Sequence, residues 1–284
     1  MGEILFPSVP SLISLTILGA LFGLILSIVK KTLRVEKDPR IEKIEEILPG
    51  ANCGACGFPG CAGYAASIVN EGVPLNLCPV GGKETIEKMA DVMDVEAEVS
   101  SSKIARVHCQ GGNDVTKIRF IYDGPLSCSA AQLVAGGFKV CEYGCLGLGD
   151  CVRSCPFDAI HLNDKDIPVV DPVKCTGCGN CVEACPRNII SLLDREFDVY
   201  VICRNKEKAP RMKKGCSVGC IACKRCEKVC RTEVFADNDE VDTAIRVVDF
   251  LAVFDYKTCI NCGRCAEVCP QDVIDFVQEK AEVK

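Results

Sequence analysis

The chain has 284 residues, of which 24 are cysteine, and a formal net charge of -6 at pH 7. The negative charge argues against a nucleic-acid partner. About one residue in twelve is cysteine, far above the usage of ordinary globular proteins. Such density indicates either a disulfide scaffold in an oxidising compartment or metal ligation in a reducing one, and the cysteine spacing favours metal.

The chain begins with its only long apolar run, residues 10–29, which has roughly the ~20 residues that a helix needs to cross a bilayer. No Lys or Arg precedes this run, whereas Lys30, Lys31 and Arg34 follow it. This arrangement favours a membrane anchor, residues 1–30, over a cleaved signal peptide. By the positive-inside rule the rest of the chain lies in the cytoplasm, where disulfides are not expected.

A small domain, residues 31–90, is expected after the anchor. It starts with a charged stretch, residues 30–46, that reads as a helix leaving the membrane. From Glu84 on, a further helix and a linker ending in Ser100–Ser102 are predicted. Between these helices lies a segment rich in glycine and cysteine, and its four cysteines provide the ligands for one 4Fe-4S cluster: Cys53, Cys56, Cys61 and Cys78.

The second half of the chain contains a duplication. Residues 139–155 align with residues 214–230 without a gap, and four cysteines coincide. Residues 104–122 read as rich in strands, and two similar strand ends, Val107-His108-Cys109 and Val201-Ile202-Cys203, also suggest a repeat. The predicted fold class is α+β, with one N-terminal transmembrane helix, a small four-cysteine module and two tandem ferredoxin-like domains, residues 103–190 and 191–277.

Each copy of the repeat leads into a regular run of cysteines at i, i+3, i+6 and i+10. This is the bacterial ferredoxin spacing, in which three thiolates bind one cluster and the fourth cysteine binds the other. Thiolate suits iron because it is a soft, anionic ligand. In the last domain, two sets are therefore expected: Cys220, Cys223, Cys226 and Cys269, and Cys230, Cys259, Cys262 and Cys265. That domain is regular except for Arg231, where the run usually has Pro.

The domain at residues 103–190 departs from the pattern, because Leu148 stands where the repeat has Cys223. The missing ligand must come from elsewhere, and Cys141 is the obvious candidate. Cys216, at the position equivalent to Cys141, is expected not to be a ligand. The predicted sets are Cys141, Cys145, Cys151 and Cys185, and Cys155, Cys175, Cys178 and Cys181.

These assignments predict about five 4Fe-4S clusters. The alternative for all sites is structural zinc, which paired CxxC motifs also bind, but the run of three cysteines plus one favours iron and sulfur. Four cysteines remain, and the simplest interpretation is that they are small buried thiols. A further cluster assembled from some of them is the alternative: Cys109, Cys128, Cys203 and Cys216.

The segment LPGANCGACGFPGCAGYA at residues 48–65, the Cys78-Pro79 pair, CEYGCLGLGDCVRSCPFDAI and the ferredoxin runs together resemble the B subunit of the Rnf complex. The match covers essentially the whole chain. The resemblance implies a complex in the inner membrane that couples electron transfer between reduced ferredoxin and NAD to sodium or proton movement. It also implies that this chain accepts electrons from soluble ferredoxin and passes them to the other subunits.

The residues support part of this expectation independently. A single transmembrane helix cannot enclose an ion path, and no dinucleotide-binding fingerprint follows a strand, so ion movement and NAD chemistry are expected on partner subunits. Electron conduction remains for this chain. The two alternatives are a membrane-anchored polyferredoxin that feeds another reductase, and a non-redox scaffold whose metal only stabilises the fold.

Overall fold

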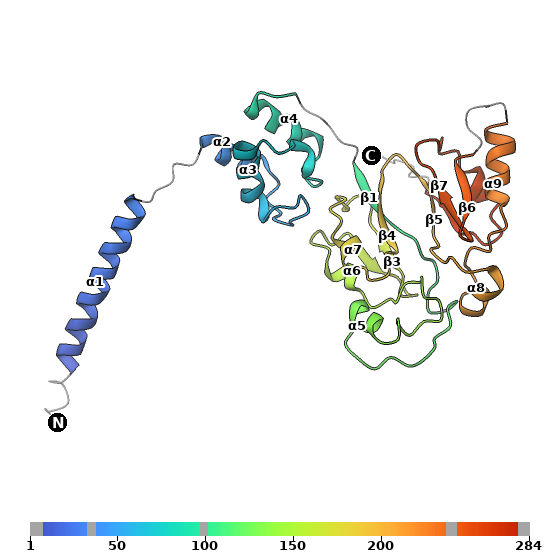
Figure 1. Ribbon diagram of the computed structural model, residues 1–284, viewed down its shortest axis with the longest axis horizontal. Helices are drawn as coiled ribbons and strands as arrows, with labels where there is room; N and C mark the ends of the chain where they lie inside the picture. Colours follow the sequence, from blue (N-terminus) through green and yellow to red (C-terminus); the bar gives the residue numbers. More distant parts are fainter. Residues whose placement is uncertain (1–7, 33–37, 97–101, 237–242, 278–284) are drawn as a thin grey trace.

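The structure is a computed structural model, and it describes residues 8–32, 38–96, 102–236 and 243–277. Figure 1 shows an N-terminal helix followed by three modules: a helical first module (residues 38–96), a middle module (102–195) and a last module (196–277). Two parts of the expected organisation lie outside the described residues. They are Arg34 of the positive flank, and Ser100 and Ser101 at the end of the linker.

Helix α1 (Ser8–Thr32) corresponds to the apolar run. Its central stretch Leu12–Val29 has a mean hydropathy of 2.6, and none of this stretch is buried against the rest of the protein. Within the described residues it is the one helix long and apolar enough to cross a membrane. The expected apolar run is therefore a single helix of sufficient length and hydropathy to be a candidate membrane span.

The first module is built from helices. Its elements are α2 (Pro39–Ile47), α3 (Gly60–Glu71), the short 3-10 turn η1 (Leu75–Leu77) and α4 (Gly82–Met93). Asp38 caps α2, since its side chain accepts a hydrogen bond from the Arg40 backbone N–H at 2.8 Å. The core of the module contains Ile44, Tyr64, Ile68 and Met89, all almost fully buried.

The middle and last modules each combine two small antiparallel sheets with short helices. In the middle module β1 (Lys103–Val107) pairs with β4 (Ile190–Asp194), and β2 (Ile160–Leu162) pairs with β3 (Pro168–Val170). Its short helices are α5 (Cys128–Leu133), α6 (Asp150–Arg153) and α7 (Asn180–Glu183).

The last module repeats this plan. Strand β5 (Val199–Val201) pairs with β8 (Ile274–Phe276), and β6 (Ile245–Val248) pairs with β7 (Leu251–Phe254). Its helical elements are α8 (Ala209–Gly215), α9 (Arg225–Val229), the π-helical turn η2 (Cys230–Val234) and α10 (Arg264–Glu267). The mixed helix and strand content agrees with the predicted α+β class.

The two strand ends noted in the sequence are equivalent in the fold. Strand β1 ends at Val107 and β5 ends at Val201, each two residues before a cysteine. The expectation of several strands in residues 104–122 is wrong, because only β1 is a strand there and the rest of the segment is loops and turns. This segment is used instead to pair with the last module.

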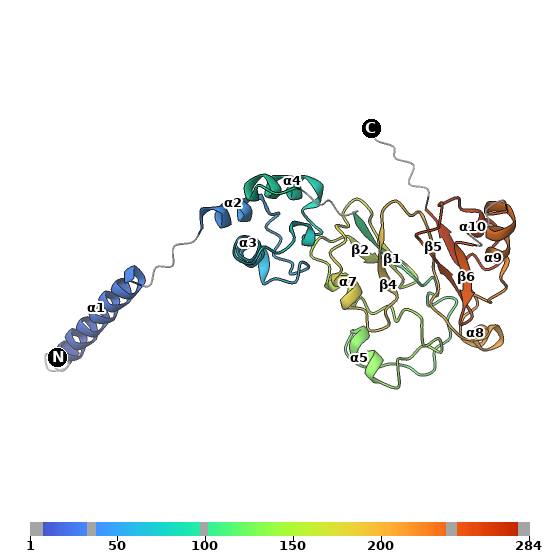
Figure 2. The same cartoon turned by 45° about the horizontal axis from the view of Figure 1, so that its top comes forward.

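The middle and last modules lie side by side in both views (Figures 1 and 2). Backbone bonds join residues 115–117 to residues 215–217, where the Lys117 N–H donates to the Gly215 carbonyl at 2.9 Å. His108 adds a side-chain link, since its Nδ1 lies 2.6 Å from the Val201 carbonyl and its Nε2 lies 2.6 Å from Ser191 Oγ. Both ring nitrogens therefore have partners at the contact between the modules.

Candidate metal centres

A short helix carries the third cysteine of each ferredoxin run. The residue before each helix has a positive φ: Gly149, Gly179 and Gly263 at +78°, +88° and +74°, and Lys224 at +60°. Glycine adopts this left-handed conformation without a steric cost, whereas for Lys224 the same conformation carries a steric cost from the Cβ atom. The turn reverses the chain so that the cysteines before and after it face the same space.

The last module brings its expected sets together. Cys220, Cys223, Cys226 and Cys269 line one cavity of about 330 Å³, part of which is open to solvent. The other set converges on Cys265: burial, followed by the nearby thiolates of Cys226, Cys259, Cys262 and Cys230, raises its pKa to about 12. Cys269 and Cys230 therefore each lie beside the three cysteines of the other run.

Arg231 has a visible structural consequence. Without the proline that usually follows the fourth cysteine, the helix does not end at Cys230 but continues as the π-helical turn η2. The Phe235 N–H donates to the Cys230 carbonyl at 3.0 Å, and Arg231 lies 3.9 Å from Glu227. The Cys230 thiol still accepts a hydrogen bond from the Ala244 N–H at 3.4 Å, so the departure leaves this cysteine in place.

In the middle module, one expected set converges as predicted. Burial raises the pKa of Cys181 to about 12, and the neighbouring thiolates of Cys175, Cys178 and Cys155 contribute in the same direction. The Cys155 thiol accepts the Ala159 N–H at 3.4 Å, which is the counterpart of the contact between the Ala244 N–H and the Cys230 thiol in the last module.

The other set of the middle module differs from the expectation. Cys145, Cys151 and Cys185 line a cavity of about 360 Å³, but the fourth cysteine in its wall is Cys128, not Cys141. Burial, followed by the nearby thiolates of Cys128 and Cys185, raises the pKa of Cys151 to about 12. The geometry therefore favours Cys128 over the expected Cys141 as the fourth member of this set.

Asp150 explains why Cys128 reaches this cavity. Its carboxylate accepts hydrogen bonds from the Ser127 hydroxyl at 3.0 Å and from the Ser129 N–H at 2.9 Å, so it holds both neighbours of Cys128. Because Asp150 precedes Cys151, these bonds fix the start of α5 beside that ligand. Leu148 packs beside Cys128 and Leu146 in a small apolar cluster. A thiol from a remote helix thus occupies the place left by the missing local cysteine.

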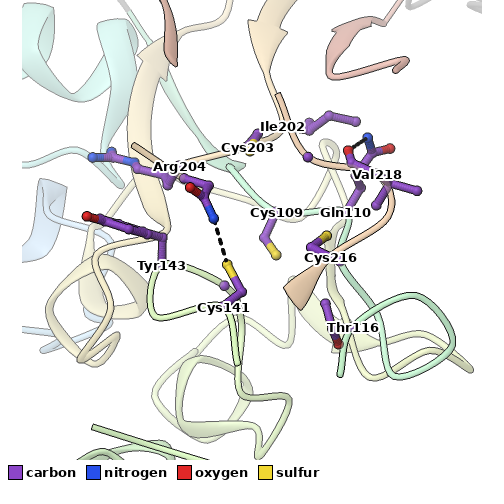
Figure 3. A pocket seen from close by; sticks show the side chains of 14 residues that line it. Cys109, Gln110, Thr116, Cys141, Tyr143, Ile202, Cys203, Arg204, Cys216 and Val218 are labelled. Atoms are coloured by element: carbon purple, nitrogen blue, oxygen red, sulfur yellow. Dashed lines mark hydrogen bonds between the residues drawn. The ribbon is translucent and has the colours of Figure 1, made fainter. Parts of the chain in front are cut away.

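Cys141 lies in a different cavity, of about 330 Å³, between the middle and last modules. The other cysteines in its wall are Cys109, Cys203 and Cys216, three of the four for which the sequence had suggested no partner. Figure 3 shows the thiols of Cys109, Cys141 and Cys216 pointing into the same space, with Cys203 on the segment above them. The expected difference between Cys141 and Cys216 is therefore not found, since both line one cavity.

The first module places its cysteines around the turn that precedes α3. Asn52 Oδ1 accepts the Cys61 N–H at 2.8 Å, and the Gly57 N–H donates to the Gly54 carbonyl at 2.8 Å. Burial raises the pKa of the Cys78 thiol, and the thiolates of Cys56 and Cys61 raise it further. Cys53 lies at the opposite end of this turn, near Cys178 of the middle module. Burial raises the pKa of Cys178, and the charge of the nearby Cys53 thiolate contributes in the same direction.

The clustered thiols share one electrostatic property. Burial and mutual repulsion raise the pKa of cysteines in every set, so several thiolates in one cavity require a compensating positive charge. Bound iron would supply that charge and favour the deprotonated thiols. Among the described residues, no three His, Cys, Asp or Glu side chains converge closely enough for a single metal ion. Four thiolates around one cavity are the donor set that a 4Fe-4S cluster uses.

Comparisons with known proteins identify the same three regions. A family described as "Putative Fe-S cluster" matches residues 48–80, and families described as "4Fe-4S dicluster domain" match residues 140–189 and 219–274. These matches and the cysteine cavities define an iron-sulfur protein with multiple 4Fe-4S clusters.

The similarity to whole proteins is more specific. The chain is 40% identical over 275 residues to the B subunit of the "Ion-translocating oxidoreductase complex" of Methanosarcina acetivorans, covering 97% of this chain and 99% of the relative. It is 40% identical over 251 residues to the B subunit of the "Proton-translocating ferredoxin:NAD(+) oxidoreductase complex" of Clostridium ljungdahlii, covering 87% and 84% of the two chains. Its counterpart in the "Na(+)-translocating" complex of Acetobacterium woodii is 41% identical over 206 residues, covering 72% of this chain and 62% of the relative. The chain therefore belongs to the B-subunit family of ion-translocating oxidoreductase, or Rnf, complexes.

Proposed function

We propose that this chain is the electron relay of a membrane-bound Rnf-type ferredoxin:NAD oxidoreductase. Soluble reduced ferredoxin is its electron donor, and the other subunits of the complex receive the electrons. Bound 4Fe-4S clusters supply one-electron chemistry, and the residues of this chain hold them, shield them and set the distances between them. Its domains are the anchor (1–30), the four-cysteine domain (31–90) and two ferredoxin-like domains (103–190 and 191–277).

The observation that carries this proposal is the succession of neighbouring cysteine sets within the first and middle modules and within the last module. Cys53 of the first module lies near Cys178, and Cys181 of that set lies near Cys151 of the next. In the last module Cys265 similarly lies near Cys226. We assign five sets of ligands: Cys53, Cys56, Cys61 and Cys78; Cys155, Cys175, Cys178 and Cys181; Cys128, Cys145, Cys151 and Cys185; Cys220, Cys223, Cys226 and Cys269; and Cys230, Cys259, Cys262 and Cys265.

Helix α1 attaches this relay to the inner membrane as a single pass, with the cluster domains on the cytoplasmic side. The apolar stretch Leu12–Val29 supports the span, and Lys30 and Lys31 at its end support the orientation. Two of the sets each contain exposed and buried thiols, since Cys223 and Cys262 are exposed whereas Cys226 and Cys265 are buried. Electron conduction accounts for this mixture. An exposed edge lets a partner approach a cluster that the protein otherwise protects from water.

The test is anaerobic purification of the intact complex, followed by subunit, iron and sulfide analysis and rapid mixing with reduced ferredoxin. We expect the other subunits of the complex to copurify and the iron-sulfur absorbance to bleach within the turnover time. Copurification with a different reductase would favour a polyferredoxin that feeds that enzyme. Stoichiometric zinc, or clusters that ferredoxin does not reduce, would favour a non-redox scaffold.

A further inference from the structure

The cavity between the middle and last modules contains four cysteines that none of the five sets uses. We propose that Cys109, Cys141, Cys203 and Cys216 hold a sixth 4Fe-4S cluster, which connects the two modules and which the buried Lys139 ammonium stabilises. The existence of the site is argued from the geometry of the cavity. Its role in conduction rests on the proposed function.

The four cysteines are two equivalent pairs, one from each copy of the repeat. Cys109 follows β1 and Cys203 follows β5, and their thiols make the same contact: the Cys145 N–H donates to Cys109 Sγ at 3.3 Å, and the Cys220 N–H donates to Cys203 Sγ at 3.4 Å. Cys141 and Cys216 occupy the same position in the aligned segments. The repeat thus places a matching pair of thiols on each side of the contact between the modules.

The size of the cavity fits a cluster. Its volume, about 330 Å³, equals that of the cavity formed by the regular ferredoxin set of Cys220, Cys223, Cys226 and Cys269. Gly111 keeps it open, because a Cβ at this position would lie 3.4 Å from Cys216 Sγ and 3.6 Å from Cys109 Sγ, inside the space between the thiols. Asn205, buried to 3% exposure, donates through Nδ2 to Cys141 Sγ at 3.4 Å. Such N–H···S bonds are typical of iron-sulfur sites.

Lys139 provides an independent indication of buried negative charge. Its side chain is 0% exposed, and its Nζ has no hydrogen-bond partner among the described residues. Lys139 lies two residues before Cys141, whose thiol lines the cavity. A buried unpaired ammonium is costly, whereas one beside an anionic four-thiolate cluster is compensated.

The sixth site also closes the one interruption in the succession of sets. Cys145 belongs to a set of the middle module and Cys220 to a set of the last module, and each of these residues donates its N–H to a thiol of the cavity. Cys203 of the last module lines the same cavity as Cys109 of the middle module. Each transfer along this path oxidises one site by one electron and reduces its neighbour by one, and moves no proton or group.

The first experiment measures iron, acid-labile sulfide and zinc in the full chain, purified anaerobically. Six clusters give about 24 iron atoms per chain, against about 20 for five. The double variant Cys203→Ser, Cys216→Ser is expected to lose about four iron and four sulfide, with the magnetic resonance signals of the other clusters retained. The matched control Thr116→Val alters the same cavity wall without removing a thiol and should keep the full iron content of the wild type.

The second experiment keeps all ligands and changes only the charge. Reduction adds negative charge, so the buried cation favours the reduced state, and Lys139→Met should lower the midpoint potentials of the clusters nearest to it. Lys214 is the repeat equivalent of Lys139 and is exposed, so Lys214→Met should leave every potential unchanged. Equal potentials in both variants and the wild type would overturn the assigned role of Lys139.

The outcomes separate this proposal from the proposed function. About 20 iron atoms in the wild type, or one zinc lost from the double variant, would overturn the sixth cluster even if ferredoxin still reduced the protein. Failure of ferredoxin to reduce a chain with about 24 iron atoms would overturn the relay and leave the site. If the double variant does not fold, the iron count of the wild type and the Lys139→Met potentials still decide the question.

Discussion

Arg187 provides a sharp test of how the middle module holds its clusters. Two residues after Cys185, its half-buried guanidinium donates to Gln132 Oε1 at 2.8 Å and to the Cys141 and Gly144 carbonyls at 2.6 and 3.1 Å, and it also bonds the Gly136 carbonyl. One side chain thus ties the ligand Cys185 to the segment that carries Cys128, Cys141 and Cys145. Burial lowers the pKa of Arg187, in agreement with a partly desolvated charge.

The size of the effect follows from these bonds. A hydrogen bond to a charged group contributes about 1.5–3 kcal/mol, and water can replace part of this at a half-buried site. Arg187→Met keeps the length of the aliphatic stem but removes the four contacts, so we expect a loss of about 3 kcal/mol. If these bonds break before the clusters are lost, the rate of cluster loss rises roughly a hundredfold, since about 1.4 kcal/mol corresponds to a factor of ten.

The assay is the bleaching of the iron-sulfur absorbance in guanidinium chloride under anaerobic conditions, with magnetic resonance to identify which clusters are lost first. Arg264→Met is the matched control, because Arg264 is 54% exposed and pairs only with the surface residues Glu233 and Glu267. Such pairs contribute about 0–1 kcal/mol. Equal bleaching rates in the two variants, or faster loss from the last module than from the middle one, would refute the reasoning.

Three further predictions concern the anchor and the first and middle modules. Removal of Met1–Val29 should give a soluble brown protein with an unchanged iron content, because no ligand precedes Cys53; loss of iron on truncation would contradict this. Tyr64→Phe should cost about 1–2 kcal/mol, since the hydroxyl donates to the Pro74 carbonyl at 2.7 Å. Burial raises the pKa of Tyr64 to about 12, so the protonated hydroxyl stabilises the fold below pH 10. This contribution is lost as the pH rises from 10 to 12. The difference in unfolding free energy between the wild type and the Phe variant should therefore shrink over that range. Gly177→Ala places a Cβ 2.5 Å from the Lys103 carbonyl oxygen at φ +72° and should lower the stability of the fold by about 2–4 kcal/mol. The control Gly50→Ala has φ +66° but open space around the Cβ, and should lower the stability by about 1 kcal/mol. Equal melting temperatures of the two variants would exclude the clash.

The ligand sets that could be predicted from sequence are those whose spacing is local. Cys220, Cys223 and Cys226 follow one another within a single turn and helix, so the geometry of the backbone alone directs them to one space. The positions of Cys269 and Cys230, each beside the other run, were also predictable, because the ferredoxin pattern relates the two runs. The long apolar helix α1 was predictable from the length of the apolar run. The mixed helix and strand content was predictable from the repeat of the ferredoxin-like segments.

The remaining sets depend on tertiary contacts that spacing does not encode. Cys128 reaches its cavity through the bonds that Asp150 makes to Ser127 and Ser129, more than twenty residues away in the sequence. The cavity between the modules depends on the pairing of residues 115–117 with 215–217. The sequence did not predict this pairing, because residues 104–122 were interpreted as rich in strands. One signal was available, however: Cys141 and Cys216 align in the repeat, and equivalent positions favour equivalent roles.

Leu148 allows the assignment of Cys128 to be tested by rescue. In the repeat it occupies the position of Cys223, and in the fold it packs in the same apolar cluster as Cys128. Cys128→Ala should convert one cluster to a three-iron form, and adding Leu148→Cys should restore the fourth iron, because the new thiol takes the position that the regular run uses. The same addition should not rescue Cys141→Ala, whose thiol lies in the other cavity. Rescue of the Cys141 variant and not of the Cys128 variant would show that Cys141 completes the ferredoxin set and that the cavity between the modules lacks a ligand.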